Sequence, residues 1–183
     1  MPSRIVNSDI PTKNLVLRVL NRREASMTEA SDTIGRDDPF DLSRFTSAQA
    51  GVYETVLAEL RSGRKRTHWM WFIFPQLEGL GHSTTAQYYA IRSVEETRQY
   101  LNHPVLGTRL TECAETVLAI DGRSVAEIFG YPDDRKLKSS MTLFAHVADP
   151  HSVFVRVLDK YFHGDQDRRT LHLVGKLEGK EEY

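Results

Sequence analysis

Hydrophobic residues recur at three- and four-residue steps along most of the chain from Phe40 onward, which is the spacing of amphipathic helices. The first stripe predicts one helix that begins after a cap at Asp41 or Ser43 and ends at Gly63. Its apolar positions are Leu42, Phe45, Val52, Val56 and Leu60. Gln49 falls inside this stripe, and an unpaired amide in a core costs about 1–3 kcal/mol. We therefore expect Gln49 to bind either a loop backbone group or a ligand.

Helix caps and further apolar stripes divide the rest of the chain. Ser83 can cap a short helix, and Ser93 to Glu96 and Ser124 to Glu127 have the spacing of capping boxes. Longer stripes cover residues 105–118, 135–147, 154–162 and 170–174. We find no clear strand-like alternation. The pattern predicts an all-α fold, a compact single-domain bundle of about seven or eight short helices over residues 38–175.

The two ends of the chain lack this pattern. Residues 1–37 are polar, and their composition predicts a disordered N-terminal extension, while residues 176–183 form a polar tail. Met27 lies close to the start of the patterned region. Our hypothesis is that Met27 is the true initiator or that the first 26 residues are dispensable, which a stability measurement on the deletion would test.

One segment, residues 64–76, combines three consecutive cations with His68 and an aromatic block that holds Trp69 and Trp71. Gln76 closes the segment after a proline. The block at 68–74 is too short to classify by periodicity, and we interpret it as a helix or an irregular core segment. It either packs in the core or lines a pocket with a basic mouth. Arg44, on the side of the first predicted helix opposite its apolar stripe, is a lone charge that we expect to be solvated.

Composition narrows the function classes only slightly. The 183 residues carry a formal net charge of -1, so the chain offers no global field for nucleic acid or an anionic membrane. The single cysteine, Cys113, lies on an apolar helix face and is interpreted as an inert core thiol in a reducing, cytoplasmic compartment. No metal-ligand spacing, G-x-x-x-x-G-K loop or membrane span occurs. We predict no cofactor, and the oligomeric state stays open.

Polar residues embedded in apolar surroundings form the candidate site: Gln49, Lys65, His68, Trp69, Gln76, Lys136, Ser139 and Ser140. Lysines and serine hydroxyls suit a phosphate, a tryptophan suits stacking on a base, and glutamine amides suit base edges. His68 is the leading catalytic candidate because histidine side chains are common proton-transfer groups in enzymes. Each feature alone also has a structural explanation. The combination favours a binding module for a nucleotide-like or phosphorylated small ligand.

Two alternatives stay open. One is a hydrolase or transferase acting on a nucleotide or ADP-ribose type of substrate, for example by cleaving an N-glycosidic bond, for which Asp41, Glu54 or Glu78 would supply a carboxylate. The other is a protein-interaction scaffold that presents Tyr88, Tyr89 and Tyr100. Convergence of Gln49, Lys65, His68 and Ser139 or Ser140 on one cavity would support a pocket built from these residues. If they point apart, the hypothesis of that pocket falls.

Four stretches carry a resemblance to a known family: Asp-Pro-Phe-Asp-Leu-Ser-Arg-Phe (38–45), Gly-Arg-Lys-Arg-Thr-His-Trp-Met-Trp-Phe-Ile-Phe-Pro-Gln (63–76), His-Pro-Val-Leu-Gly-Thr-Arg-Leu (103–110) and Lys-Leu-Lys-Ser-Ser-Met-Thr-Leu-Phe (136–144). Over residues 38–174 the chain resembles the bacterial and fungal family called domain of unknown function 1810. The resemblance implies a compact all-helical domain and supplies no function. The first 37 residues depart from the family pattern, which fits the hypothesis about Met27.

Overall fold

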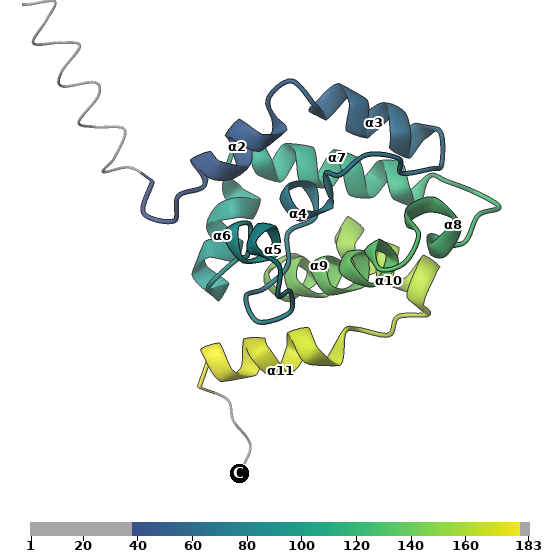
Figure 1. Cartoon of the computed structure of the whole chain (residues 1–183). Coiled ribbons are helices and arrows are strands. Elements are labelled where there is room, and N and C mark those ends of the chain that lie inside the picture. The colour runs from purple at the N-terminus through teal and green to yellow at the C-terminus, as the bar shows by residue number, and fades with distance from the viewer. Residues whose placement is uncertain (1–37, 180–183) are drawn as a thin grey trace, which may run out of the picture. The chain divides into compact units, whose positions relative to one another are not determined.

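The computed structural model describes residues 38–179 and shows ten helices and no strand in that range (Figure 1). The helices are α2 (Ser43–Gln49), α3 (Tyr53–Arg61), α4 (Met70–Ile73), α5 (Thr84–Tyr88), α6 (Val94–Asn102), α7 (Leu106–Leu118), α8 (Val125–Phe129), α9 (Asp133–Val147), α10 (Val153–Phe162) and α11 (Arg168–Leu177). The all-α prediction is confirmed, with more helices than expected. The disorder predicted for residues 1–37 and the hypothesis about Met27 lie outside the described residues.

The ten described helices all belong to one compact unit, which begins at Leu42. Two of these helices organise its core. α7 packs against α3, α6 and α10, while α9 packs against α6, α8, α10 and α11 (Figure 1). Their buried faces include Leu110, Val117, Met141 and Phe144. α11 continues to Leu177, past residue 175, where the apolar pattern placed the end of the helical domain.

The single helix expected between residues 43 and 63 is wrong, because the chain breaks it into α2 and α3. Ala50 is extended and Gly51 takes a φ of 76°, a left-handed conformation that favours glycine. α2 starts after Leu42, whose side chain cannot cap the helix, and Ser43 is already its first helical residue. Apolar residues on both sides of the break keep their three- and four-residue spacing. Periodicity alone therefore cannot reveal that the helix is interrupted.

Arg44 is buried, and the expectation that it is solvated is wrong. Only 4% of the residue is exposed, and its guanidinium lies 2.6 Å from the Glu96 carboxylate. It also donates to the carbonyls of Tyr88 and Ala90. The second oxygen of Glu96 accepts from the Arg92 backbone N–H. This buried ion pair joins α2 to the start of α6.

Helix starts in the middle of the chain follow the predicted caps. Ser83 accepts from the backbone N–H of Ala86, and Ser124 with Glu127 forms a complete capping box at α8. Ser93 caps α6 by accepting from the Glu96 N–H, but the Glu96 side chain is used by Arg44 instead of closing a box. Among the described residues, none of the helices is long and apolar enough to cross a membrane.

Candidate functional site

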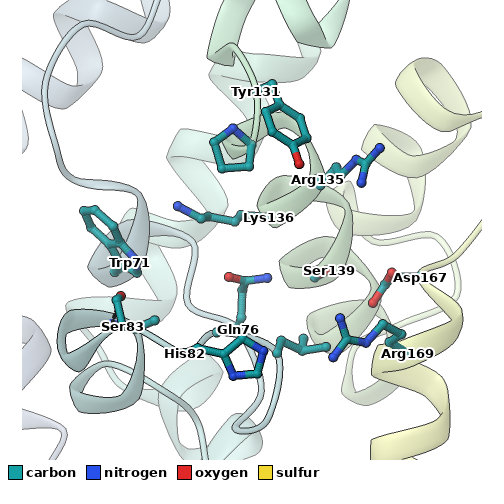
Figure 2. A pocket seen from close by; sticks show the side chains of 14 residues that line it. Trp71, Gln76, His82, Ser83, Tyr131, Arg135, Lys136, Ser139, Asp167 and Arg169 are labelled. Carbon is teal, nitrogen blue, oxygen red and sulfur yellow. Dashed lines mark hydrogen bonds between the residues drawn. The ribbon is translucent and has the colours of Figure 1, made fainter.

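A cavity of about 430 Å³ opens between segments that lie far apart in the sequence (Figure 2). A volume of this size is in the range of small-molecule sites. Its lining residues are Trp71, Gln76, Leu80, Gly81, His82, Ser83, Ala86, Tyr131, Pro132, Arg135, Lys136, Ser139, Asp167 and Arg169. They come from α4 and the loop after it, from α5, from the start of α9 and from the start of α11.

The first two turns of α9 provide one wall. Lys136 and Ser139 are three residues apart, so they lie on the same face of the helix and both reach the cavity. Tyr131 and Pro132, joined by a cis peptide bond, precede the helix and continue this wall. The next helical position, Ser140, turns toward the core, where it is fully buried.

The Lys136 ammonium is held by two contacts. It donates to Oδ1 of Asp133 at 2.8 Å and lies 4.5 Å from the ring centroid of Trp71. Lys65, which does not line the cavity, lies 2.7 Å from the other oxygen of Asp133. Burial opposes ionisation of Asp133, but the hydrogen bonds from Lys136 and Lys65 outweigh it and keep the pKa of the carboxyl below its usual value. Two ammonium groups share one carboxylate, so the cluster keeps one excess positive charge.

Two arginines add further positive charge. Arg135 lies over the ring of Tyr131, with 5.1 Å between its guanidinium carbon and the ring centroid, and Arg169 joins the lining from the start of α11 (Figure 2). Within residues 38–179 neither guanidinium has a carboxylate partner. Asp167 is the single acidic residue of the lining, and its Oδ2 caps α11 by accepting from the N–H and hydroxyl of Thr170. The lining is therefore cationic.

Glu59 fixes the basic segment that precedes α4. Its carboxylate, 7% exposed as a residue, accepts from the backbone N–H groups of Arg66 and Thr67 and from the indole of Trp69. It also accepts from the Thr67 hydroxyl at 2.7 Å. Burial alone would raise the pKa of Glu59. The hydrogen bonds from these donors lower the pKa by more, so it lies below its usual value. The hydrogen bond to Glu59 holds Trp69 in the core, whereas Trp71, two residues on, lines the cavity.

The eight predicted site residues do not converge as a set. Gln76, Lys136 and Ser139 line the cavity. The other five do not line it: Gln49, Lys65, His68, Trp69 and Ser140. His68 is exposed, Trp69 is only 2% exposed, and the buried Ser140 hydroxyl has no hydrogen-bond partner within the described residues.

Gln49 has its amide engaged inside the protein. Its nitrogen donates to the carbonyl of Phe72 at 2.8 Å and lies 3.3 Å from the Tyr100 hydroxyl, and its oxygen accepts from Arg109. Of the two partners left open by the sequence, the structure supplies the backbone group.

The sequence did not predict several residues that line the cavity. Tyr131, Arg135 and Arg169 carry no local motif, and Asp167 has the surroundings of a polar loop. Their role follows from tertiary packing alone, since α11 lies along α9 in the fold (Figure 1). For Arg135 the only available signal was its position beside Lys136.

Comparisons with known proteins identify the family. The profile described as "Protein of unknown function (DUF1810)" matches residues 39–174. The chain belongs to this family. This DUF1810 chain is also similar to a solved structure, the conserved hypothetical protein Rv1873 from Mycobacterium tuberculosis, with 58% identity and a TM-score of 0.74. The similarity covers 75% of this chain and 99% of that chain. No curated protein matches the DUF1810 chain.

Proposed function

We propose that the cavity binds a phosphorylated small molecule. The observation that carries the proposal is the gathering of Lys136, Arg135 and Arg169 around one cavity whose single acidic residue, Asp167, is engaged in capping a helix. A cationic concave site raises the local concentration of anions. Guanidinium groups match the geometry of phosphate oxygens, and charge-assisted hydrogen bonds are the stronger ones.

Neutral donors complete a phosphate site. The Ser139 hydroxyl reaches the cavity from α9, and Ser83 lies across from it at the start of α5 (Figure 2). Lys136 uses one of its three N–H donors on Asp133, which leaves donors for a ligand. The Trp71 and Tyr131 rings add apolar surface for the part of the ligand that is not phosphate.

Binding has more support than catalysis. The carboxylates suggested for glycosidic cleavage at Glu54 and Glu78 do not line the cavity, and the Asp167 carboxylate that does is tied to α11. His68, the leading catalytic candidate, is exposed and outside the lining. The scaffold alternative also loses a member, because Tyr100 is completely buried. A cytoplasmic location stays a prediction from the sequence.

A binding screen tests the proposal. Thermal unfolding is followed with inorganic phosphate, ribose 5-phosphate, nucleoside monophosphates and the matching unphosphorylated nucleosides. A ligand at one hundred times its Kd stabilises the folded state by about 2.7 kcal/mol, which is a clear rise in Tm. We expect phosphorylated compounds to raise the Tm and nucleosides to have little effect. The absence of any response to every phosphorylated compound at millimolar concentration would overturn the proposal.

Adjacent arginines at the start of α11 provide a matched control. Arg169 lines the cavity and Arg168 does not. Losing one charge-assisted hydrogen bond costs about 1.5–3 kcal/mol, so Arg169→Ala should weaken binding about tenfold to a hundredfold. Arg168→Ala removes the same charge from the same helix but no lining residue, so it should change Kd by less than about threefold. Equal effects of the two variants would mean that the field of the protein, and not this cavity, attracts the ligand.

A further inference from the structure

The amide of Gln76 lies in the middle of the lining side chains, between Lys136 and His82 (Figure 2). Within the described residues no group hydrogen-bonds to this side chain. A side-chain amide offers one carbonyl acceptor and an NH₂ donor beside it. In the cavity both are directed at space that a ligand would fill.

The backbone holds Gln76 firmly in place. Its carbonyl accepts from the N–H of Ile91 at 2.9 Å, and the next residue, Leu77, is buried and forms an isolated parallel bridge with Ile91. Pro75 before it is also buried and has a restricted φ. The side chain therefore projects from a fixed point, which is the condition for selective hydrogen bonding.

The two glutamines near the aromatic block differ in this respect. Gln49 uses both ends of its amide on protein groups, namely Phe72, Tyr100 and Arg109. Gln76 uses neither. A site whose polar groups match those of a ligand rejects an analogue that lacks them, because the groups are then left unpaired. The available donor and acceptor of Gln76 consequently favour a ligand edge with an acceptor and a donor side by side.

We propose that Gln76 selects a nucleobase, so that the phosphorylated ligand of this cavity is a nucleotide. The inference rests on the proposed function, because the cationic groups bind the phosphate and Gln76 contacts the base. A nucleobase edge presents a ring or exocyclic acceptor next to an N–H donor, which is the complement of an amide. Glutamine recognises adenine in this way in nucleic-acid complexes. Trp71 and Tyr131 supply apolar contact beside that edge.

The experiment compares ligands that share a sugar phosphate and differ at the base. Calorimetry gives Kd for ribose 5-phosphate and for AMP, GMP, CMP and UMP with the full chain. We expect at least one nucleotide to bind at least tenfold more tightly than ribose 5-phosphate. Gln76→Ala should reduce that ratio to within about threefold and leave the Kd of ribose 5-phosphate unchanged within about twofold. Gln87→Ala is the control, because Gln87 lies on α5 outside the lining.

A second variant keeps the shape of the side chain. Gln76→Glu replaces the amide donor with an acceptor, so the order of preference among the four nucleotides should change while the melting temperature stays close to that of the wild type. The inference is overturned if Gln76→Ala keeps the full preference of the wild type, or if no nucleotide binds more tightly than ribose 5-phosphate. In either case tight binding of ribose 5-phosphate would leave the proposed function standing. If none of the phosphorylated compounds binds, both the proposed function and the inference about Gln76 are overturned.

Discussion

The Glu59 carboxylate shows what one buried side chain contributes to this molecule. Four donors from the segment between residues 66 and 69 converge on it. These contacts hold the basic turn in one conformation and place Trp69 in the core. The sequence offered no sign of this, since Glu59 occupies an ordinary position on an amphipathic helix and its partners follow only after the turn.

Replacing Glu59 by glutamine should destabilise the protein. Hydrogen bonds to a charged group contribute about 1.5–3 kcal/mol each, and the isosteric Glu59→Gln removes the charge and turns one acceptor into a donor. We expect a loss of about 2–4 kcal/mol in the free energy of unfolding at pH 7, from chemical denaturation. A loss below about 0.5 kcal/mol would contradict the view that the Glu59 carboxylate stabilises the segment between residues 66 and 69.

The same residue predicts a pH dependence. The pKa of Glu59 is lowered by folding, so its contribution is complete above the ordinary glutamate value of 4.5 and is lost as the pH falls through the lower folded value. The difference in stability between wild type and Glu59→Gln should therefore narrow when denaturation is repeated at progressively lower pH below 4.5. A difference that is constant across this window would show that the charge of Glu59 is not involved.

The buried ion pair between Arg44 and Glu96 gives a second prediction at this scale. Removing one partner of a buried pair leaves an uncompensated charge, which costs about 3–5 kcal/mol. Arg44→Ala should show a loss of that order by denaturant unfolding. Arg98, which pairs with Glu95 at 3.5 Å on the surface of α6, is the control. Arg98→Ala should cost less than about 1 kcal/mol, and equal losses would contradict the burial of Arg44.

At the scale of elements, one face of α9 packs in the core and another lines the cavity. Met141 and Phe144 pack in the core, and the sequence predicted this face from its apolar spacing. Lys136 and Ser139 face the cavity. The sequence put Ser139 and Ser140 together in the candidate site, although Ser140 falls on the apolar side of the helix. One residue turns a helix by 100°, and only Ser139 reaches the cavity.

Close packing between α6 and α7 depends on a glycine. A Cβ at Gly107 would lie 1.8 Å from the carbonyl oxygen of Leu101, which is backbone and cannot move aside as a side chain can. Gly107→Ala should therefore destabilise the fold by about 3 kcal/mol, at the upper end of overpacking effects, despite the better helix propensity of alanine. Thr108→Ala, at the adjacent exposed position, should cost less than about 1 kcal/mol, and similar melting temperatures for the two variants would refute the close approach.

At the scale of the whole molecule, the cavity joins residues from position 71 to position 169. The sequence indicated the helical class and three of the lining residues, Gln76, Lys136 and Ser139. It did so because these polar residues interrupt apolar runs. Arg169 does not interrupt an apolar run. Its position at the cavity depends on the packing of α11 against α9. Long-range packing of this kind leaves no local pattern in the sequence.

The two tryptophans allow the central claim to be tested in the unmodified protein. Trp71 lines the cavity, whereas the indole N–H of Trp69 donates to Glu59 within the core. Each gives one indole cross-peak in a ¹H–¹⁵N spectrum, and Trp71→Phe assigns them. On titration with AMP or ribose 5-phosphate, the Trp71 peak should shift saturably while the Trp69 peak stays in place. If neither peak moves at millimolar ligand, or if only the Trp69 peak moves, the cavity is not the binding site.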